Sequence, residues 1–488
     1  EIPKRDWSSD VCSSDLRAPK FPMPDNYLFL LRFSTLGKHE AIKNYVILTL
    51  KKMAYGGIYD QLGGGFARYS TDYDWKVPHF EKMLYDNAQL MSLYSEAYVA
   101  TKNTLFKNVV YETYDFLLRE LLSNEGSFYS ALDADSEMVE GKFYVWQKSE
   151  IEELLGDDAE LFCEYYNVNQ HGLWEHDNYI LLRRKDDETL AAEQNISTEI
   201  LHEKISRCKI ILLAKRNKRI RPGLDDKQLT SWNALLIKGL ASAYMVFDDD
   251  RFLKQALQCA QFIIDKITSN EQRLFHNYKN GKATINGFLE DYAFVIEAWI
   301  LLYQATFDEQ WLHHAKALAD ICFEDFYDES AGMFLFKSKH DESLFSINYE
   351  IQDNVMPASN SSLARSLFML AKYFGVYNFK LVAAQMLRNV KSDLLRYPSA
   401  YSNWGMLFLE LSHPYYEVCI CGRDAKAKAQ RLRKHYRPNV LFAGSEGSSN
   451  LILLDGKSSG SNSLIYICKN NSCLQPISNI EEALSLMQ

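Results

Sequence analysis

Apolar residues recur at helical spacing through most of the chain, from about residue 25 to residue 412. In four segments, beginning near residues 79, 229, 290 and 361, apolar positions occupy nearly every side of the predicted helix. Such a helix must be covered by protein all round, because water would otherwise meet its apolar side chains. The pattern therefore predicts four helices buried inside a large helical domain.

Each buried helix is followed by a more amphipathic helix with one charged face. The four followers span residues 105–122, 251–267, 309–326 and 379–396. Two concentric rings of helices require such a repeat, because the inner ring is buried and only the outer ring touches water. An open stack of helical repeats is the alternative, but its repeats are usually about 33 to 47 residues long, and here the buried helices recur at longer intervals. We therefore expect a mainly α fold, an (α/α) toroid or barrel.

Two stretches depart from this repeat. Residues 127–224 mix short strand-like and helical segments, and we expect them to be an elaborated connector with short β-hairpins rather than a separate domain. After Pro414, strand-like segments alternate with two helices and predict a small α/β subdomain over residues 414–488. The toroid itself is expected to cover residues 17–413.

The first sixteen residues are treated separately. Arg5 begins the string RDWSSDVCSSDL, which has no periodicity and resembles a translated sequencing adapter. We exclude residues 1–16 from the argument as a sequencing artefact, and Cys12 is given no role.

Charge and hydropathy exclude several kinds of partner. The formal net charge is -10, which disfavours sequence-independent binding to the phosphates of nucleic acids. One basic run, at residues 215–221, is expected to be a solvated loop. No stretch of about eighteen uncharged apolar residues occurs, so we expect no membrane partner. Nine cysteines, an odd number in a long chain without a secretory signal, are typical of reduced thiols in the cytoplasm.

Several strings together resemble one family. They are PKFPMPDNYLFLLRF from Pro19, GGIYDQLGGGFARYSTDYDWKVPHFEKMLYDNAQL from Gly56, ALDADSE from Ala131, GKFYVWQ from Gly141, PGLDDKQLTSWNALLIKGLA from Pro222 and NGFLEDYAF from Asn286. From about Pro19 to its end, the chain resembles the thioredoxin-domain-containing family of the spermatogenesis-associated thioredoxin-like proteins. The resemblance implies a toroid of the six-hairpin glycosidase type, similar to N-acylglucosamine 2-epimerases, preceded in the family by a thioredoxin-like domain. That domain would lie before Pro19, and the chain has no Cys-x-x-Cys.

Candidate catalytic residues gather in the connectors that precede the buried helices, at the same phase of the repeat. They are His79, Glu81, Asp133, Asp135, Asp225, Asp226, Glu290 and Asp291. A closed ring would bring these groups to one mouth, where two carboxylates in different environments can act as acid and base. Helix capping and salt bridges are the alternative explanation. We favour Asp226 and Glu290 as the acid–base pair.

Further polar and aromatic residues beside these acids are candidates for substrate binding. They are Trp75, Trp232, Asn233, Tyr69, Asp86 and Asp353. Sugar rings stack on aromatic side chains, although aromatic residues also form ordinary core. His79, Glu81 and Asp86 are expected in the first turns of a helix that follows Pro78.

Neither a metal nor a cofactor is expected. Four cysteines of the C-terminal segment could supply thiolates, but their spacing departs from the usual zinc knuckle, and buried structural thiols are the favoured interpretation. These are Cys419, Cys421, Cys468 and Cys473.

The favoured hypothesis is a carbohydrate-active protein with a carboxylate-lined pocket at one mouth of the toroid, acting on a small carbohydrate as a glycoside hydrolase or sugar epimerase. The alternative is a non-catalytic scaffold that serves a thioredoxin-like redox domain outside this chain. Acids that cluster in a pocket favour the enzyme. Acids that are all used in helix caps and salt bridges favour the scaffold.

Overall fold

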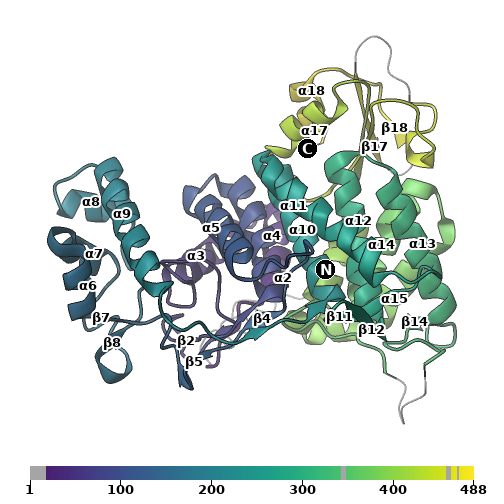
Figure 1. Cartoon of the computed structure of the whole chain (residues 1–488). Helices are drawn as coiled ribbons and strands as arrows, with labels where there is room; N and C mark the ends of the chain where they lie inside the picture. The colour runs from purple at the N-terminus through teal and green to yellow at the C-terminus, as the bar shows by residue number, and fades with distance from the viewer. Residues whose placement is uncertain (1–17, 342–347, 458–462, 470–471, 488) are drawn as a thin grey trace.

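Six helices pack in sequence around a closed ring in the computed structural model, which describes residues 18–341, 348–457, 463–469 and 472–487 (Figure 1). The last helix of the ring packs against the first, so the ring closes. The six are α2 (Pro24–Gly37), α4 (Leu84–Thr101), α10 (Thr230–Phe247), α12 (Leu289–Thr306), α14 (Ser359–Phe374) and α16 (Ser402–Ser412). The expectations for residues 1–16, Cys12 included, lie outside the described residues.

Amphipathic helices cover this ring from outside. They are α3 (Glu40–Tyr55), α5 (Thr104–Glu120), α11 (Asp250–Phe262), α13 (Gln310–Asp325) and α15 (Tyr377–Arg396). Each packs on the inner helix that precedes it. The prediction of an (α/α) toroid of the six-hairpin glycosidase type is confirmed. The repeat pattern identified four of the inner helices, and α2 and α16 complete the ring.

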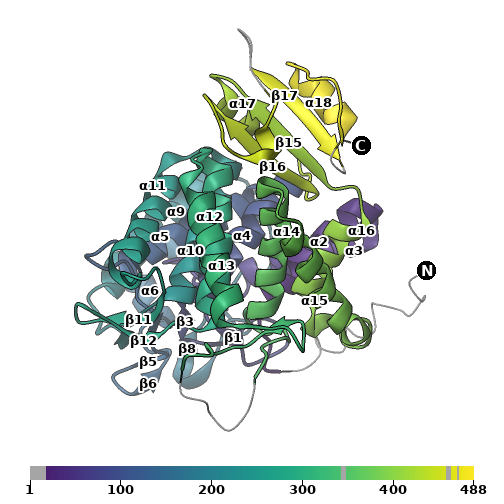
Figure 2. The same ribbon diagram turned by 90° about the vertical axis from the view of Figure 1, so that its right-hand side faces the viewer.

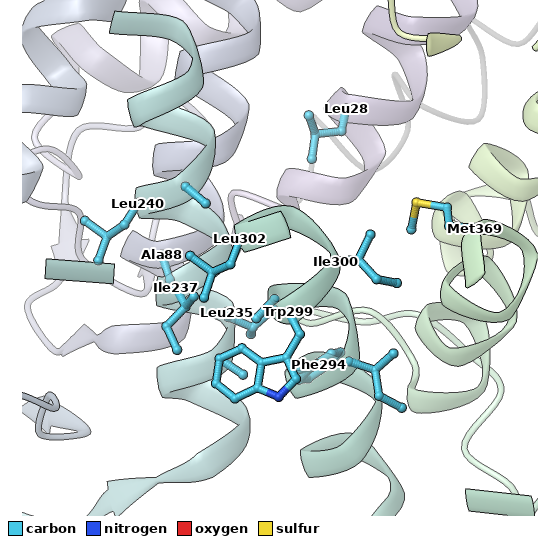
Figure 3. Close-up of a cluster of buried hydrophobic side chains, with 14 of the residues drawn as sticks. Leu28, Ala88, Leu235, Ile237, Leu240, Phe294, Trp299, Ile300, Leu302 and Met369 are labelled. Atoms are coloured by element: carbon cyan, nitrogen blue, oxygen red, sulfur yellow. The ribbon is translucent and has the colours of Figure 1, made fainter. Parts of the chain in front are cut away.

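The interior of the ring is filled by large apolar side chains. Figure 3 shows Leu235 and Ile237 of α10 beside Phe294 and Trp299 of α12, all of them buried. Both helices are apolar on nearly every side, as the sequence pattern requires. Burying this surface is the main favourable contribution to folding.

The helix expected to begin near residue 79 begins instead at Leu84. Residues 78–83 form two short strands, β2 (Pro78–His79) and β3 (Lys82–Met83), which pair with β1 (Tyr69–Ser70) and β4 (Ala131–Leu132). The N–H of Arg68 also donates to the carbonyl of Glu81 at 2.9 Å. Because these interstrand bonds use the backbone groups that a helix would need, His79 and Glu81 lie before α4 and not on it.

Short strands link the outer helices to the inner ones. Four such connectors form a three-stranded sheet β3–β4–β9, a second sheet β10–β11–β12, and the hairpin β13–β14. The additional strands are β9 (Leu224–Asp225), β10 (Gln228–Leu229), β11 (Phe275–Lys279), β12 (Lys282–Asn286), β13 (Tyr327–Asp328) and β14 (Met333–Phe334). All of them lie near the N-terminal ends of the inner helices (Figures 1 and 2).

A repeated asparagine clamp fastens these connectors to the ring. On three inner helices, a buried Asn side chain accepts from the backbone N–H of a Phe and donates to the carbonyl of the same Phe, at 2.7–3.0 Å. The pairs are Asn87 with Phe66, Asn233 with Phe128 and Asn360 with Phe334. The amide of Asn233, expected to bind substrate, is used in this clamp.

Residues 127–224 form a helical lobe with its own apolar cluster around Trp146, Phe162 and Leu201. Its elements are the hairpins β5 (Asp135–Ser136)–β6 (Val139–Glu140) and β7 (Trp146–Gln147)–β8 (Asn178–Tyr179), and the helices α6 (Lys148–Leu155), α7 (Ala159–Tyr165), α8 (Asp187–Glu193) and α9 (Thr198–Arg216).

The prediction of a solvated loop at residues 215–221 holds for the exposure of Lys215, Lys218 and Arg221 but is wrong for two arginines. Arg216 ends α9, is buried, and pairs with Asp60 at 2.8 Å. Arg219 pairs with Glu150 at 2.8 Å. The partners lie far away in the sequence, so the local charge pattern could not show that these guanidinium groups are neutralised.

The C-terminal segment packs over the opposite end of the barrel, at the C-terminal ends of the inner helices (Figure 2). Its sheet has the order β16–β15–β17–β18, with β15 parallel to β16 and antiparallel to β17. Tyr373 of α14 donates to the carbonyl of Phe442 on β16 at 2.8 Å. The elements are β15 (Tyr416–Cys421), α17 (Ala425–Arg433), β16 (Val440–Ser445), β17 (Leu464–Lys469), β18 (Ser472–Cys473) and α18 (Ile480–Leu486).

Two cysteines depart from the expectation of reduced thiols. Cys468 and Cys473, opposite each other on β17 and β18, form a disulfide. Cys419 and Cys421 remain buried free thiols, as do the other cysteines of the described ranges. The pairing of Cys468 with Cys473 leaves no four-thiolate set at this sheet.

None of the described helices is long and apolar enough to cross a lipid bilayer.

Candidate functional site

Several acidic side chains lie where the connectors meet the N-terminal ends of the inner helices. Backbone N–H groups at a helix N-terminus point toward this end and favour negatively charged or hydrogen-bond-accepting groups. Three corners of this mouth carry buried carboxyl groups, on or beside α12, α4 and α14.

At the α12 corner, Asp291 joins three elements. Its Oδ2 lies 2.9 Å from Nδ1 of His276 on β11 and accepts from the N–H of Phe288 at 2.9 Å. Its Oδ1 accepts from the N–H of Ser231, on the first turn of α10, at 3.0 Å. Asp291 is therefore a buried structural carboxyl that orients the imidazole of His276.

Glu290, next to Asp291 in the sequence, is the second carboxyl of this corner and our candidate for the reacting group. Its Oε1 lies 3.4 Å from the hydroxyl of Ser231 and 4.0 Å from Nδ1 of His276. Its side chain is 13% exposed. Burial, followed by the charges of Asp291 and Glu350, raises the pKa of Glu290 to about 8. The carboxyl is therefore largely protonated at neutral pH, as a general acid requires.

His276 carries the complementary charge. Burial acts to lower its pKa, but the hydrogen bond and charge of Asp291 and the charge of Glu290 outweigh burial and raise the pKa above its ordinary value. His276 and Asp291 form a hydrogen-bonded pair at 2.9 Å beside Glu290, and burial raises the pKa of Asp291 as well. The α12 corner therefore combines Glu290, a carboxyl with a raised pKa, with the His276–Asp291 pair, whose position is fixed by hydrogen bonds.

The α4 corner contributes Asp86 and Tyr85. Asp86 is only 1% exposed, and burial raises its pKa well above the ordinary value. The ring of Tyr85 meets that of Trp232 edge-on, with centroids 4.8 Å apart. Trp232 is half-buried on the first turn of α10, next to Ser231, so it is the predicted stacking residue that lies beside the α12 corner.

At the third corner, Asp353 precedes α14 and accepts three hydrogen bonds. They come from the N–H of Ala358 at 2.9 Å, the hydroxyl of Ser361 at 2.7 Å and the N–H of Asn403 at 2.8 Å. Burial, and then the charge of Asp25 on α2, raises the pKa of Asp353 to about 7. The side chain holds α14 and α16 together and is half protonated near neutral pH.

The remaining predicted residues are paired, covered or exposed to solvent, and of these Glu81 lies at the edge of the α4 corner, where its charge and that of Arg68 act on Asp86. His79 stacks on Tyr69, with centroids 4.8 Å apart, and pairs with Glu140 at 2.8 Å, while Glu81 pairs with Arg68 at 3.0 Å. Trp75 is 2% exposed and its ring is covered by protein. Two further predicted acids face solvent on the connector surface, namely Asp133 and Asp135.

Asp225 and Asp226 are paired with surface lysines. Asp225 lies 3.1 Å from Nζ of Lys227, and Asp226 lies 2.5 Å from Nζ of Lys279. The hydrogen bond from Lys279 lowers the pKa of Asp226. Strand β11 carries His276 beside Glu290, and Lys279 three residues further on. At about 3.3 Å per residue, Asp226 lies roughly 10 Å along the strand from Glu290.

Side chains of His276, Glu290 and Asp291 could in principle share a cation, since one ligand atom from each lies within 4.8 Å of the others. Both oxygens of Asp291 already accept hydrogen bonds, however, and His276 presents Nδ1 to that carboxylate. The trio is better described as a hydrogen-bonded acid–base cluster.

Sequence reasoning missed several contributors to the mouth. His276 stands alone on a strand, and Glu350 lies in an irregular connector, so neither carries a motif. Asp25 follows Pro24 in the first turn of α2, the same phase of the repeat as Asp86 and Asp291. Extending the repeat to the first helix would have identified Asp25.

The fold and the acidic mouth define an (α/α) toroid with an acid–base cluster at the N-terminal ends of its inner helices. Uncharacterized protein B0495.5 of Caenorhabditis elegans is 30% identical to the chain over 512 residues, covering 96% of this chain and 70% of that protein. Spermatogenesis-associated protein 20 of Homo sapiens is 30% identical over 522 residues, covering 96% of this chain and 66% of that protein. The chain belongs to the family of these proteins and spans about two thirds of their length.

Solved structures with a similar chain path include three carbohydrate-related proteins. A sugar epimerase from a ruminal bacterium matches 71% of each chain at 12% identity and a TM-score of 0.43. Cellobiose 2-epimerase from Bacillus thermoamylovorans matches 72% of each chain at 13% identity and a TM-score of 0.44. An α-mannanase from Bacteroides thetaiotaomicron matches 83% of this chain and 96% of its own, at 13% identity and a TM-score of 0.44. No protein-family model matches the chain.

Proposed function

We propose that this protein is a carbohydrate-active enzyme, a glycoside hydrolase or sugar epimerase, whose site lies at the mouth formed by the N-terminal ends of α4, α10 and α12. Glu290 donates the proton, and Trp232 provides the surface on which a sugar ring stacks. The proposal rests on the placement of the largely buried Glu290 carboxyl beside Ser231 and the hydrogen-bonded His276–Asp291 pair, with a pKa raised to about 8.

The chemistry of both reaction classes requires such a group. Cleaving a glycosidic bond requires a proton on the leaving oxygen, and epimerisation requires a proton to leave and return at a carbon next to a carbonyl. A carboxyl with a pKa of about 8 holds its proton at neutral pH and releases it readily. A general base must be ionised, and Glu350 is the adjacent carboxylate whose charge Glu290 senses. We assign Glu350 that role.

Sugar hydroxyls also suit the remaining groups at the mouth. A polyhydroxylated ligand donates to carboxylate oxygens and accepts from hydroxyl and imidazole donors, and the α12 corner offers all of these in Glu290, Ser231 and His276. The half-buried ring of Trp232 lies beside Ser231 on the same helical turn. A sugar seated there would cover an apolar ring face and replace water on the polar groups.

The test compares Glu290→Gln with the parent protein. The substitution keeps the size and the acceptor oxygen but removes the transferable proton. Disaccharides and reducing monosaccharides are incubated with each protein, and new reducing ends and 2-epimers are measured by chromatography. We expect turnover by the parent and a loss of at least about 100-fold in the variant.

Glu329→Gln is the matched control, because Glu329 is an exposed glutamate on the β13–β14 turn. It should leave turnover unchanged. If Glu290→Gln keeps full turnover, Glu290 is not the proton donor. If the parent protein neither turns over nor is stabilised by any sugar, the carbohydrate assignment fails.

A second candidate function is a scaffold for a thioredoxin-like domain outside this chain. It is supported by the use of Glu81, Asp225 and Asp226 in ion pairs with Arg68, Lys227 and Lys279, since carboxylates committed to structure cannot act on substrate. A protein with no turnover that binds a thioredoxin-like domain through its connector face would favour the scaffold.

A further inference from the structure

A partly open cavity lies at the opposite end of the barrel, between the inner ring and the C-terminal sheet. It has a volume of about 210 Å³ and is lined by all six inner helices. Its roof is formed by α17, the segment after it and β16. The lining includes the C-terminal segment, so the cavity lies on the side of the ring away from the acidic mouth.

The floor of the cavity is a ring of six charged side chains, one from each inner helix. Their signs alternate around the barrel. In order along the ring they are Arg32, Glu96, Lys238, Glu297, Arg365 and Glu410. Three are positive and three are negative, so the ring is neutral as a whole.

Members of the ring neutralise one another directly. Arg32 pairs with Glu96, Lys238 lies 2.8 Å from Glu297, and Arg365 lies 2.8 Å from Glu410 and 3.7 Å from Glu297. Although burial acts to raise the pKa of Glu297, Lys238 and Arg365 outweigh it and hold the carboxylate ionised. The ring therefore needs no counter-ion from a ligand.

Arg433 adds a positive charge to this lining, as does Arg437, and the charge of Asp248 acts on Arg433 without a salt bridge between them. It ends α17 and lines the cavity from above. Its guanidinium donates to the carbonyl of Gln304 and lies over the ring of Phe442, with Cζ 4.8 Å from the centroid. Among the described residues no carboxylate forms a salt bridge with it, and its Nε has no hydrogen-bond partner. Burial lowers its pKa to about 10, so Arg433 still carries its charge at neutral pH.

The rest of the lining is mostly apolar. Leu28 and Met369, which Figure 3 places on different helices, face this space together with other side chains of the same kind. Four methionines are among them, and the flexible thioether of methionine adapts to ligands of varied shape. They are Met245, Met369, Met406 and Met487. An apolar cavity with a few placed charges is the usual form of a small-molecule site.

We propose that this cavity binds a small amphipathic anion, a carboxylate with an apolar chain or ring. The negative head would meet Arg433, and the apolar body would lie among the methionines above the charge ring. A half-buried guanidinium with no carboxylate in a salt bridge is costly, and a bound carboxylate relieves that cost. A cationic or uncharged ligand of the same size would leave Arg433 uncompensated.

Octanoate is the probe that tests the site, with octylamine and octanol as matched chains bearing a positive and a neutral head. We expect octanoate at millimolar concentration to raise the melting temperature of the full chain, and the other two compounds to leave it unchanged or lower it. Affinity for the carboxylate should rise about fourfold per methylene from butanoate to octanoate, because each buried methylene adds a similar favourable free energy of binding.

Arg433→Gln should weaken octanoate binding at least tenfold. Arg431→Gln is the matched control, since Arg431 lies on the same helix and is exposed, and it should bind like the parent. Methyl-labelled methionine gives a readout that does not depend on folding stability: signals of Met369 and Met406 should move on addition of octanoate, while that of exposed Met138 should not.

Equal responses to octanoate and octylamine, equal effects of the two arginine variants, or methyl signals that stay fixed in the parent protein would each overturn the proposal. Glu290→Gln should retain octanoate binding in full. Failure of the octanoate proposal can therefore be distinguished from failure of the carbohydrate proposal for the other end of the barrel.

Discussion

Replacing Glu290 by Gln should stabilise the protein, and the gain should depend on pH. The carboxyl has a pKa of about 8 in the folded protein, 3.5 above its ordinary value of 4.5. Between these two values the folded chain holds a proton that the unfolded chain has released. The stability contributed by this proton is fully present below pH 4.5 and is lost as the pH rises to 8. Glutamine does not titrate, so the variant avoids this loss.

The size of the effect follows from the pKa difference. At about 1.4 kcal/mol per pKa unit, complete loss corresponds to roughly 5 kcal/mol. A barrel of about 400 residues unfolds with an entropy near 0.8 kcal/mol/K, which converts this loss to roughly 6 °C. Solvent reaches the edge of the Glu290 side chain and screens part of the effect. We therefore expect the variant to melt about 3 to 6 °C above the parent at pH 8.5, and within about 1 °C of it at pH 5.

Thermal melts of both proteins between pH 5 and pH 9 provide the assay. The difference in melting temperature should grow through pH 7 and level off above pH 8, while Glu329→Gln should show no trend. His276 is present in both proteins, and its contribution differs only through the Glu290 charge, which helps to raise its pKa in the parent. A difference that is constant with pH, or that favours the parent at high pH, would refute the assignment of a raised pKa to Glu290.

Further predictions concern the framework of the barrel. Asn233→Ala removes the clamp on its connector and should lower stability by about 2 to 4 kcal/mol, seen as a drop of several degrees in thermal melts, while exposed Asn108→Ala should have no effect. Arg365→Met leaves two buried carboxylates of the charge ring without their shared partner and should lower the free energy of unfolding by about 3 to 5 kcal/mol. In the same melts, the exposed control Arg388→Met should cause no change. After mild reduction, Cys473 should become the thiol most reactive to iodoacetamide among the described cysteines, measured by peptide mass spectrometry, because the free thiols of that set are buried.

The fold was predictable because the buried helices are apolar on every side. That pattern requires an enclosing layer, and α10, α12 and α14 begin within two residues of the positions at which the repeat predicts them. The start of α4 was misplaced because residues 78–83 pair with strands that are distant in sequence. The local pattern of apolar residues gives no information about pairing partners that are distant in the sequence. The pairing of Arg216 with Asp60 was missed for the same reason.

The surroundings of a candidate site residue were predictable only where local sequence determines them. Glu290 lies in the first turn of α12, a helix that is apolar on nearly every side, so its burial follows from its position. His276 and Glu350, which complete its surroundings, come from a strand and an irregular connector and have no local signature. Asp226 has the same phase in the repeat but ends beside Lys279 on the surface. The position of an acid within the helical repeat therefore does not determine whether its side chain faces inward.

The central claim is that Glu290 is a protonated acid at neutral pH, and a direct titration tests it best. Protein labelled with ¹³C at the glutamate carboxyl carbons can be titrated by NMR from pH 4 to pH 10, with Glu290→Gln identifying the signal. The account predicts one carboxyl signal that titrates near pH 8 and is missing from the variant. Titration of the Glu290 signal near pH 4 to 5, like an ordinary exposed glutamate, would contradict it.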